Sequence, residues 1–333
     1  MHRTGSARFM YISVFYGVFC ALLTSLVHPK GAFFLLQAAS MTEGHWKNLW
    51  KYMPILCLFV GAAFVYSRAY LDKERMRDAL FALTGCLVFM WAFSMFKMSM
   101  PYILPYWADP LFARFDQILH FGTDPWRLIE PLRAPLGTEL MDYVYLKLWA
   151  WPAVVGPLML VIFDRDPERV SRYLMLFLFT WIFLGNVLAL AFLSVGPVYH
   201  DRLLEADTFA ALNAVLNSPE ERASLMGIVR EWLWVVKNPD YQGVSSGISA
   251  FPSVHVGVAT LSCFYLCERS RYLAPLGILF LVLILLGSVL SGLHYAVDGY
   301  ASFLVVSLAW FFTRQTGRVS DGSGSLASLR PLT

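Results

Sequence analysis

The feature that most constrains this chain is a series of long runs of apolar residues. Several runs reach about 18–20 residues, the length that an α-helix needs to cross a hydrocarbon core about 30 Å thick. The composition agrees, since 58% of the 333 residues are hydrophobic and 15% are charged, against about 45–50% and 25% in a typical soluble domain. In lipid the backbone must satisfy its own hydrogen bonds, so each run must be helical. The sequence therefore predicts an all-α, polytopic transmembrane helical bundle.

Eight spans in three regions are predicted from this pattern. Residues 1–78 hold two N-terminal transmembrane helices, residues 79–313 hold the main transmembrane domain, and residues 314–333 form a tail. The first run follows Arg3 and Arg8 but lacks a cleavage site of small residues, so we interpret it as a retained span rather than a signal peptide. The predicted spans are residues 9–27, 53–70, 79–98, 143–163, 173–195, 252–267, 272–290 and 294–312.

Basic residues in the loops predict the orientation of these spans, because Lys and Arg are enriched on the cytoplasmic side. With the N-terminus inside, the short inner segments hold 14 Lys and Arg residues, and the much longer outer loops hold 10. We therefore expect both termini to be cytoplasmic. A bacterial inner membrane with a periplasmic outer face fits this pattern, and a lumenal face of a eukaryotic membrane fits the same physics.

Two outer loops, residues 99–142 and 196–250, are long and contain amphipathic stretches. The stretch 112–122 and the stretch 220–237 alternate apolar and polar residues at nearly helical spacing. Such helices lie in the membrane interface. They would either cover a lipid-facing cavity or only anchor the loops. The small net charge of +3 gives no sign of a nucleic-acid partner.

The first cluster of chemically competent residues precedes the sixth predicted span. Pro252 suits the first turn of a helix, where a missing N–H costs nothing. The free amides of that turn, with the Ser253 hydroxyl, are typical of an anion site. His255 lies in the same turn and would donate to a phosphate or protonate a leaving oxygen. The alternative is an N-capping serine beside an interfacial histidine.

The second cluster begins the eighth predicted span. His294 and Asp298 are four residues apart and therefore share one helix face. A carboxylate placed there holds the imidazole in one tautomer and leaves the other nitrogen free as a nucleophile. A structural His–Asp pair is the alternative. Because one helical hairpin separates His255 from His294, we expect both to return to the same membrane face.

The third cluster lies where the fifth predicted span ends. Tyr199 would donate a hydrogen bond to a phosphate, and Arg202 would bind it through two N–H groups. The alternative is an ordinary helix exit with a Gly196-Pro197 break.

These residues resemble a known family. Pro252-Ser253-x-His255 and His294-Tyr-x-x-Asp298 are similar to the second and third signature motifs of the type 2 phosphatidic acid phosphatase (PAP2) superfamily. The resemblance is closest to its inositolphosphotransferase-like branch, which includes fungal inositol phosphorylceramide synthase. The specific likeness covers residues 247–302, and the helix pattern extends it to residues 81–312.

The resemblance implies a six-helix PAP2-like core and a double displacement without metal or cofactor. His294 would be the nucleophile that forms a phosphohistidine, and Asp298 would orient it. His255 would protonate the departing alkoxide and later activate water or an acceptor hydroxyl. Ser253 would help to hold the phosphoryl oxygens, with Arg202 and Tyr199 as further phosphate-binding candidates. The implied substrate is a lipid phosphate or phosphodiester, and the implied acceptor is a hydroxyl of a lipid or polyol.

The chain departs from the family pattern at two places. The first motif, a Lys followed by Arg-Pro, is absent in that form, and Ser288 stands where an Arg usually precedes the nucleophilic His. These departures resemble the transferase branch more than a plain phosphatase. Two other classes stay open. One is a metal-dependent membrane hydrolase using His255, His294 and Asp298, and the other is a non-enzymatic lipid transporter or binding protein.

Overall fold

The computed structural model describes residues 5–32, 72–236 and 247–322, with side chains as far as Arg314. Over these ranges the chain is helical and contains no strand. The predicted span 53–70 and most of the predicted tail lie outside the described residues. The expected all-α fold is confirmed.

Five described segments are long and apolar enough to cross a membrane, as expected of an integral membrane protein. Two more helices, α16 (Val254–Arg269) and α17 (Ala274–Leu290), form a hairpin of 16 and 17 residues. Every predicted span within the described ranges falls on one of these seven segments, and four of the predictions run two to four residues past an end of the segment. The five long segments are α1 (Gly5–Val27), α4 (Lys73–Ser99) with the turn that follows it, α8 to α9 (Thr138–Phe163), α10 to α11 (Pro167–Ala191) and α18 (Ala296–Gly322).

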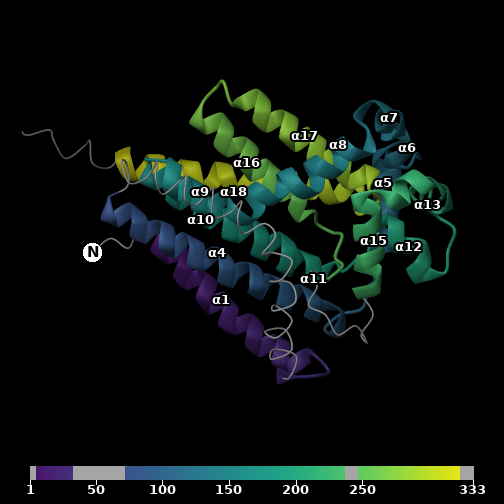
Figure 1. Cartoon of the computed structure of the whole chain (residues 1–333), viewed down its shortest axis with the longest axis horizontal. Helices are drawn as coiled ribbons and strands as arrows, with labels where there is room; N and C mark the ends of the chain where they lie inside the picture. The colour runs from purple at the N-terminus through teal and green to yellow at the C-terminus, as the bar shows by residue number, and fades with distance from the viewer. Residues whose placement is uncertain (1–4, 33–71, 237–246, 323–333) are drawn as a thin grey trace, which may run out of the picture.

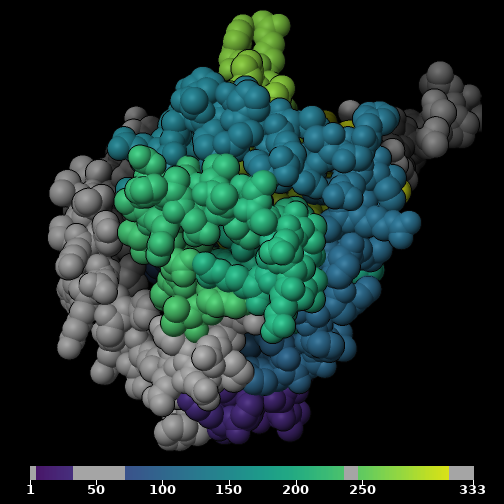
Figure 2. Space-filling view, turned by 90° about the vertical axis from the view of Figure 1, so that its right-hand side faces the viewer, coloured from purple at the N-terminus to yellow at the C-terminus, as the bar shows by residue number. Residues whose placement is uncertain are grey.

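The long helices run side by side, and the short helices gather at one end of the bundle (Figure 1). Figure 2 looks onto this end, where the short helices lie together on the surface. We call them the outer cap. They are α5 (Asp109–Leu119), α6 (Pro125–Ile129), α7 (Arg133–Leu136), α8 (Thr138–Asp142), α12 (Pro197–Leu204), α13 (Ala210–Leu216), α14 (Pro219–Ala223) and α15 (Leu225–Val236).

Both amphipathic stretches expected in the outer loops are helical, but the second is broken. The first stretch falls in α5, and the second divides at Ser224 into α14 and α15. The Ser224 hydroxyl donates to the Glu221 carbonyl at 2.9 Å and accepts from the Gly227 amide at 3.0 Å. One serine therefore ends α14 and caps α15, because its side chain competes with the backbone for both bonds.

Aromatic side chains fill the core between the long helices. Phe9 of α1, Phe89 of α4 and Phe177 of α10 meet at ring separations of about 6.2 Å. Gly85 lets α1 approach α4, since a Cβ there would lie 2.6 Å from the Phe9 ring. The segment after α10 widens into the π-helix η5 (Thr180–Leu188), and α8 continues into the π-helix η3 (Tyr143–Leu148). Such π-turns are frequent at functional sites.

Candidate active site

The two predicted histidine motifs meet at the capped end of the bundle. His255 lies in the first turn of α16, and His294 lies just before α18. The α16–α17 hairpin leaves and returns to the same end, so the two rings face one another with centroids 6.1 Å apart and planes at 61°. The structure therefore brings both predicted histidines within reach of one small group.

His294 is supported from behind by Asp298. The Asp298 carboxylate is fully buried, and its Oδ2 lies 3.2 Å from His294 Nδ1. The same oxygen accepts from the Tyr295 amide at 3.0 Å. Since Nδ1 faces the carboxylate, Nε2 is the nitrogen turned away from Asp298. No partner for Asp298 Oδ1 is found among the described residues.

Asp116 of α5 fixes the beginning of α18 beside this pair. Its two carboxylate oxygens accept from the amides of Ala296 and Val297 at 2.8 and 2.9 Å. The carboxylate therefore caps α18 from another helix, which satisfies amides that a helix start leaves free. Burial raises the pKa of Asp116 to about 6, although the two amides act in the opposite direction.

Asp109, at the start of α5, binds the segment before α12 to the segment that carries His294. It accepts from the Val195 and Gly196 amides at 2.9 Å and from the Tyr295 hydroxyl at 3.0 Å. Burial raises the pKa of Asp109 despite these donors. Gly196, at a φ of 89°, passes so close to the His294 turn that a Cβ would lie 2.3 Å from the Leu293 carbonyl oxygen. Any side chain at position 196 would therefore displace this turn.

A cavity of about 290 Å³ opens in front of the two histidines. Its polar end is lined by Lys97, His255 and His294, and no carboxylate is among the described residues that line it. The polar end thus suits an anion. The remaining wall is mostly apolar and includes Met90, Phe93, Trp149, Trp181, Leu233, Ile248 and Leu293.

Lys97 is the residue that the sequence reasoning missed. It lies in the last turn of α4, a helix expected only to span the membrane. A lysine inside a span usually marks a functional site, because burying its charge is costly. That signal was available in the sequence, but the place of Lys97 beside His255 and His294 depends on how α4 packs against α1, α9 and η5.

The beginning of α16 offers a second feature for binding an anion. Ser253 is fully buried and caps the helix, its Oγ accepting from the Val256 amide at 3.4 Å. Val254 and His255 line the cavity, and within the described part of the chain their amides donate to no backbone carbonyl outside the helix. Free amides at a helix N-terminus bind anions. Ser253 itself points into the helix start rather than into the cavity.

The third predicted cluster is divided by the structure. Tyr199 lines the cavity, but its hydroxyl donates to the Arg230 carbonyl at 2.7 Å. Arg202 lies at the surface, paired with Glu231 at 2.9 Å, and does not line the cavity. The spacing in sequence could not reveal this, because α12 turns Tyr199 inward and Arg202 outward.

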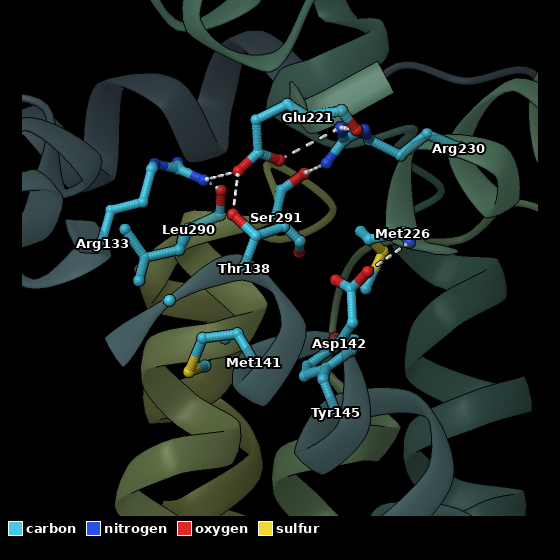
Figure 3. Close-up of a pocket in the computed structure, with 12 residues that line it drawn as sticks. Arg133, Thr138, Met141, Asp142, Tyr145, Glu221, Met226, Arg230, Leu290 and Ser291 are labelled. Carbon is cyan, nitrogen blue, oxygen red and sulfur yellow. Dashed lines mark hydrogen bonds and ion pairs between the residues drawn. The ribbon is translucent and has the colours of Figure 1, made fainter. Parts of the chain in front are cut away.

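Behind the site, two arginines join the outer cap to the segment that carries His294 (Figure 3). Arg133 of α7 donates to the Leu290 carbonyl at 2.8 Å and to Glu221 at 3.0 Å. Arg230 of α15 donates to the Ser291 carbonyl at 3.4 Å. These are carbonyls at the end of α17, which a helix leaves unsatisfied. The space between these groups, about 30 Å³, is large enough to admit a water molecule.

Comparison with known proteins gives the family. The fold and the cavity describe a polytopic membrane protein with a histidine-lined cavity at one end of its helices. The family model of the PAP2 superfamily matches residues 110–312, well over half of the chain, and the chain belongs to this superfamily. Neither a curated protein nor a solved structure matches the chain. Membership suggests phosphatase or phosphotransferase activity on a phosphate ester.

Within the described ranges, no three side chains of His, Cys, Asp or Glu are close enough to hold a metal ion. His255 and His294 face one another, but the nearest carboxylate, Asp298, lies behind His294 rather than between them. The donor set considered for a metal-dependent hydrolase therefore does not converge on one point.

Proposed function

We propose that the protein is a lipid phosphotransferase or lipid phosphate phosphatase that acts through a phosphohistidine at the outer face of the membrane. The observation that carries the proposal is the convergence of His294, His255 and Lys97 on one cavity, with Asp298 buried behind His294. Within the PAP2 superfamily, the resemblance to the inositolphosphotransferase-like branch remains part of this proposal.

In the first step the lone pair of His294 Nε2 attacks the phosphorus atom. The N–P bond forms as the P–O bond to the leaving alkoxide breaks, and His255 gives its proton to that alkoxide, which leaves as an alcohol. Asp298 balances the positive charge that develops on His294. Lys97 and the free amides of α16 bind the phosphoryl oxygens.

In the second step the hydroxyl oxygen of water or of an acceptor alcohol attacks the same phosphorus atom. Its proton passes to His255, and the N–P bond breaks with its electron pair returning to Nε2. The enzyme is then regenerated with His255 protonated for the next turnover. Water as acceptor makes the protein a phosphatase, and a lipid or polyol hydroxyl makes it a transferase.

The shape of the cavity supports a lipid substrate. Its wall on α4 runs from Lys97 down to Met90, which is about 10 Å along a helix that rises 1.5 Å per residue. A water-soluble phosphate ester has no need of an apolar extension below its phosphate. A lipid, by contrast, places its phosphate at Lys97 and its chain along Met90 and Phe93.

The outer cap supports transfer rather than hydrolysis. Tyr199 of α12 and Leu233 of α15 line the cavity from the cap side. Excluding water protects a phosphoenzyme until an alcohol arrives. We therefore infer that an acceptor alcohol competes well with water at this site.

The test is to incubate the purified protein in chelator with a lipid phosphate labelled on phosphorus and to quench in mild base. We expect acid-labile label on the wild type and none on His294→Ala. His200→Ala is the matched control, because His200 contacts Asp201 at 3.0 Å but does not line the cavity. It should keep the label.

Either of two results would contradict the proposal. One is label that survives in His294→Ala, and the other is turnover of a lipid phosphate by that variant at the wild-type rate. Adding alcohols to labelled wild-type protein then separates transfer from hydrolysis, since transfer yields a labelled phosphodiester or phosphate ester of the added alcohol.

A further inference from the structure

The His255 ring is held between two aromatic rings of the third described span. The Tyr145 ring stacks on it at 4.4 Å with an interplanar angle of 4°, and the Trp149 ring stacks on it at 3.8 Å with an angle of 22°. Two rings at these separations cannot share one face of an imidazole. Tyr145 and Trp149 therefore lie on opposite faces of His255.

Trp149 also holds the backbone of His255. Its indole Nε1 donates to the His255 carbonyl at 3.0 Å. One side chain thus fixes both the first turn of α16 and the plane of the ring that projects from it. The faces of the imidazole are covered, and its edge is the part left to reach the cavity that it lines together with His294.

The π-helix η3 explains how two residues of one helix reach both faces of a ring. Tyr145 lies within η3, and Trp149 follows at its end. A π-turn is wider than an α-turn. Tyr145 and Trp149, four residues apart, therefore stay on one side of the helix, and their rings are far enough apart to admit the His255 ring between them. Tyr145 is fully buried, which keeps this spacing fixed.

We propose that Tyr145 and Trp149 are positioning residues that set the orientation of His255 as the general acid and base and stabilise its protonated ring between their faces. This inference rests on the proposed function. Aromatic faces attract a cation, so the pair favours the imidazolium that donates a proton in the first step and is regenerated in the second. Trp149 also lines the cavity, whereas Tyr145 does not, so Tyr145→Leu reports on His255 without removing part of the cavity wall.

A purely structural role predicts a different pattern of defects. If the two rings only fill space, their loss slows every substrate in equal proportion. If they act through His255, their loss slows only reactions in which the leaving oxygen needs a proton. An alkoxide needs that proton, and a nitrophenolate does not, because it is stable as an anion.

The experiment measures the single-turnover rate of His294 labelling with two phosphate monoesters, one of a long-chain alkanol and one of a long-chain alkyl nitrophenol. For Trp149→Leu and Tyr145→Leu, we expect the labelling rate with the alkanol ester to fall roughly 10- to 100-fold. This is part of the 10²–10⁴-fold acceleration typical of general acid–base catalysis. The labelling rate with the nitrophenyl ester should change by less than about threefold, because its leaving group needs no proton. Trp149→Phe, which keeps an aromatic face, should recover most of the loss.

Two comparisons make the result specific. In the His255→Ala background, adding Trp149→Leu should cause no further loss with the alkanol ester, because residues that act as a unit are not additive. Phe93→Leu removes another aromatic ring from the cavity wall, one whose ring contacts are to Phe89 and Trp181 rather than to His255, Tyr145 or Trp149. It should slow both esters equally.

Equal losses with both esters in Trp149→Leu, or a further loss in the double variant, would overturn the inference. Wild-type protein that gains no label from either ester would instead contradict the proposed function. The two failures are therefore distinguishable in one set of measurements.

Discussion

At the residue scale, the histidines of the site are held in different ways. His294 is fixed through one nitrogen, by a buried carboxylate four residues further along the same chain segment. Within the described part of the chain no carboxylate bonds to His255, which is fixed through its ring faces and its backbone carbonyl. A nucleophile needs one defined tautomer, whereas a group that gives and takes a proton must leave its nitrogens accessible. The two supports match these two proposed roles.

Lys97 allows a direct test of anion binding. In Lys97→Met we expect the KM for a lipid phosphate to rise about 10- to 100-fold, because a hydrogen bond to a charged group contributes about 1.5–3 kcal/mol. Lys147→Met is the matched control, since Lys147 lies exposed on η3 and does not line the cavity. Steady-state kinetics in mixed micelles measure both. An unchanged KM in Lys97→Met would remove Lys97 from the phosphate site.

At the element scale, the short helix α5 organises the site without lining the cavity. Its two buried aspartates bind the start of α18 and the segment before α12. The Phe112 ring of the same helix stacks on Phe251 at 4.2 Å, next to the start of α16. One amphipathic helix therefore contacts three segments that converge on the histidines.

Asp116 makes stability depend on pH in a defined direction. The folded protein holds the Asp116 proton up to a pKa of about 6, whereas an unfolded carboxyl loses its proton near pH 4. Between about pH 4 and about pH 6 the folded state binds more protons than the unfolded state. The contribution of Asp116 to the free energy of unfolding therefore falls as the pH rises through this range. Asn at this position cannot titrate.

We therefore expect the melting temperature of the wild type in detergent to be highest relative to Asp116→Asn near pH 4. Above about pH 6 the wild type should have lost stability relative to the variant. Asp164→Asn is the comparison, because hydrogen bonds from Arg169, the Asp166 amide and Tyr265 outweigh burial and lower the pKa of Asp164 to about 2. Its difference from wild type should stay constant between pH 4 and 6. A constant difference for Asp116→Asn would refute the prediction.

At the scale of the whole molecule, the outer cap lies at one end of the bundle and the α16–α17 loop points away from it (Figure 1). Tyr199 and Leu233 of the cap line the cavity, which therefore lies at the capped end. The excess of basic residues in the short loops predicts that the capped end faces outward. This orientation decides which pool of lipid and acceptor the cavity meets.

Cysteine labelling in intact cells tests the orientation. In a background without native cysteines, Phe121→Cys after α5 and Tyr272→Cys in the α16–α17 loop place thiols at side chains that are 99% and 77% exposed. We expect a membrane-impermeant maleimide to label position 121 in intact cells and position 272 only after permeabilisation. The opposite pattern would place the cavity in the cytoplasm.

The sequence by itself determined the class of fold and the pairing of the histidines. An apolar run that crosses a bilayer must be helical, because only a helix satisfies its backbone hydrogen bonds within one segment. Seven predicted spans fall on helices within the described ranges. The four-residue spacing of His294 and Asp298 is a local property of one helix. One hairpin between His255 and His294 sufficed to bring both to one end.

Only the tertiary structure decided what surrounds the two histidines. It brought Lys97 into the cavity, turned Arg202 to the surface, capped α18 with Asp116 and placed His255 between Tyr145 and Trp149. Each of these contacts joins segments far apart in the chain. The physical reason is that hydrophobic periodicity specifies which residues face lipid, whereas the rotation and depth of each helix follow from packing against its neighbours.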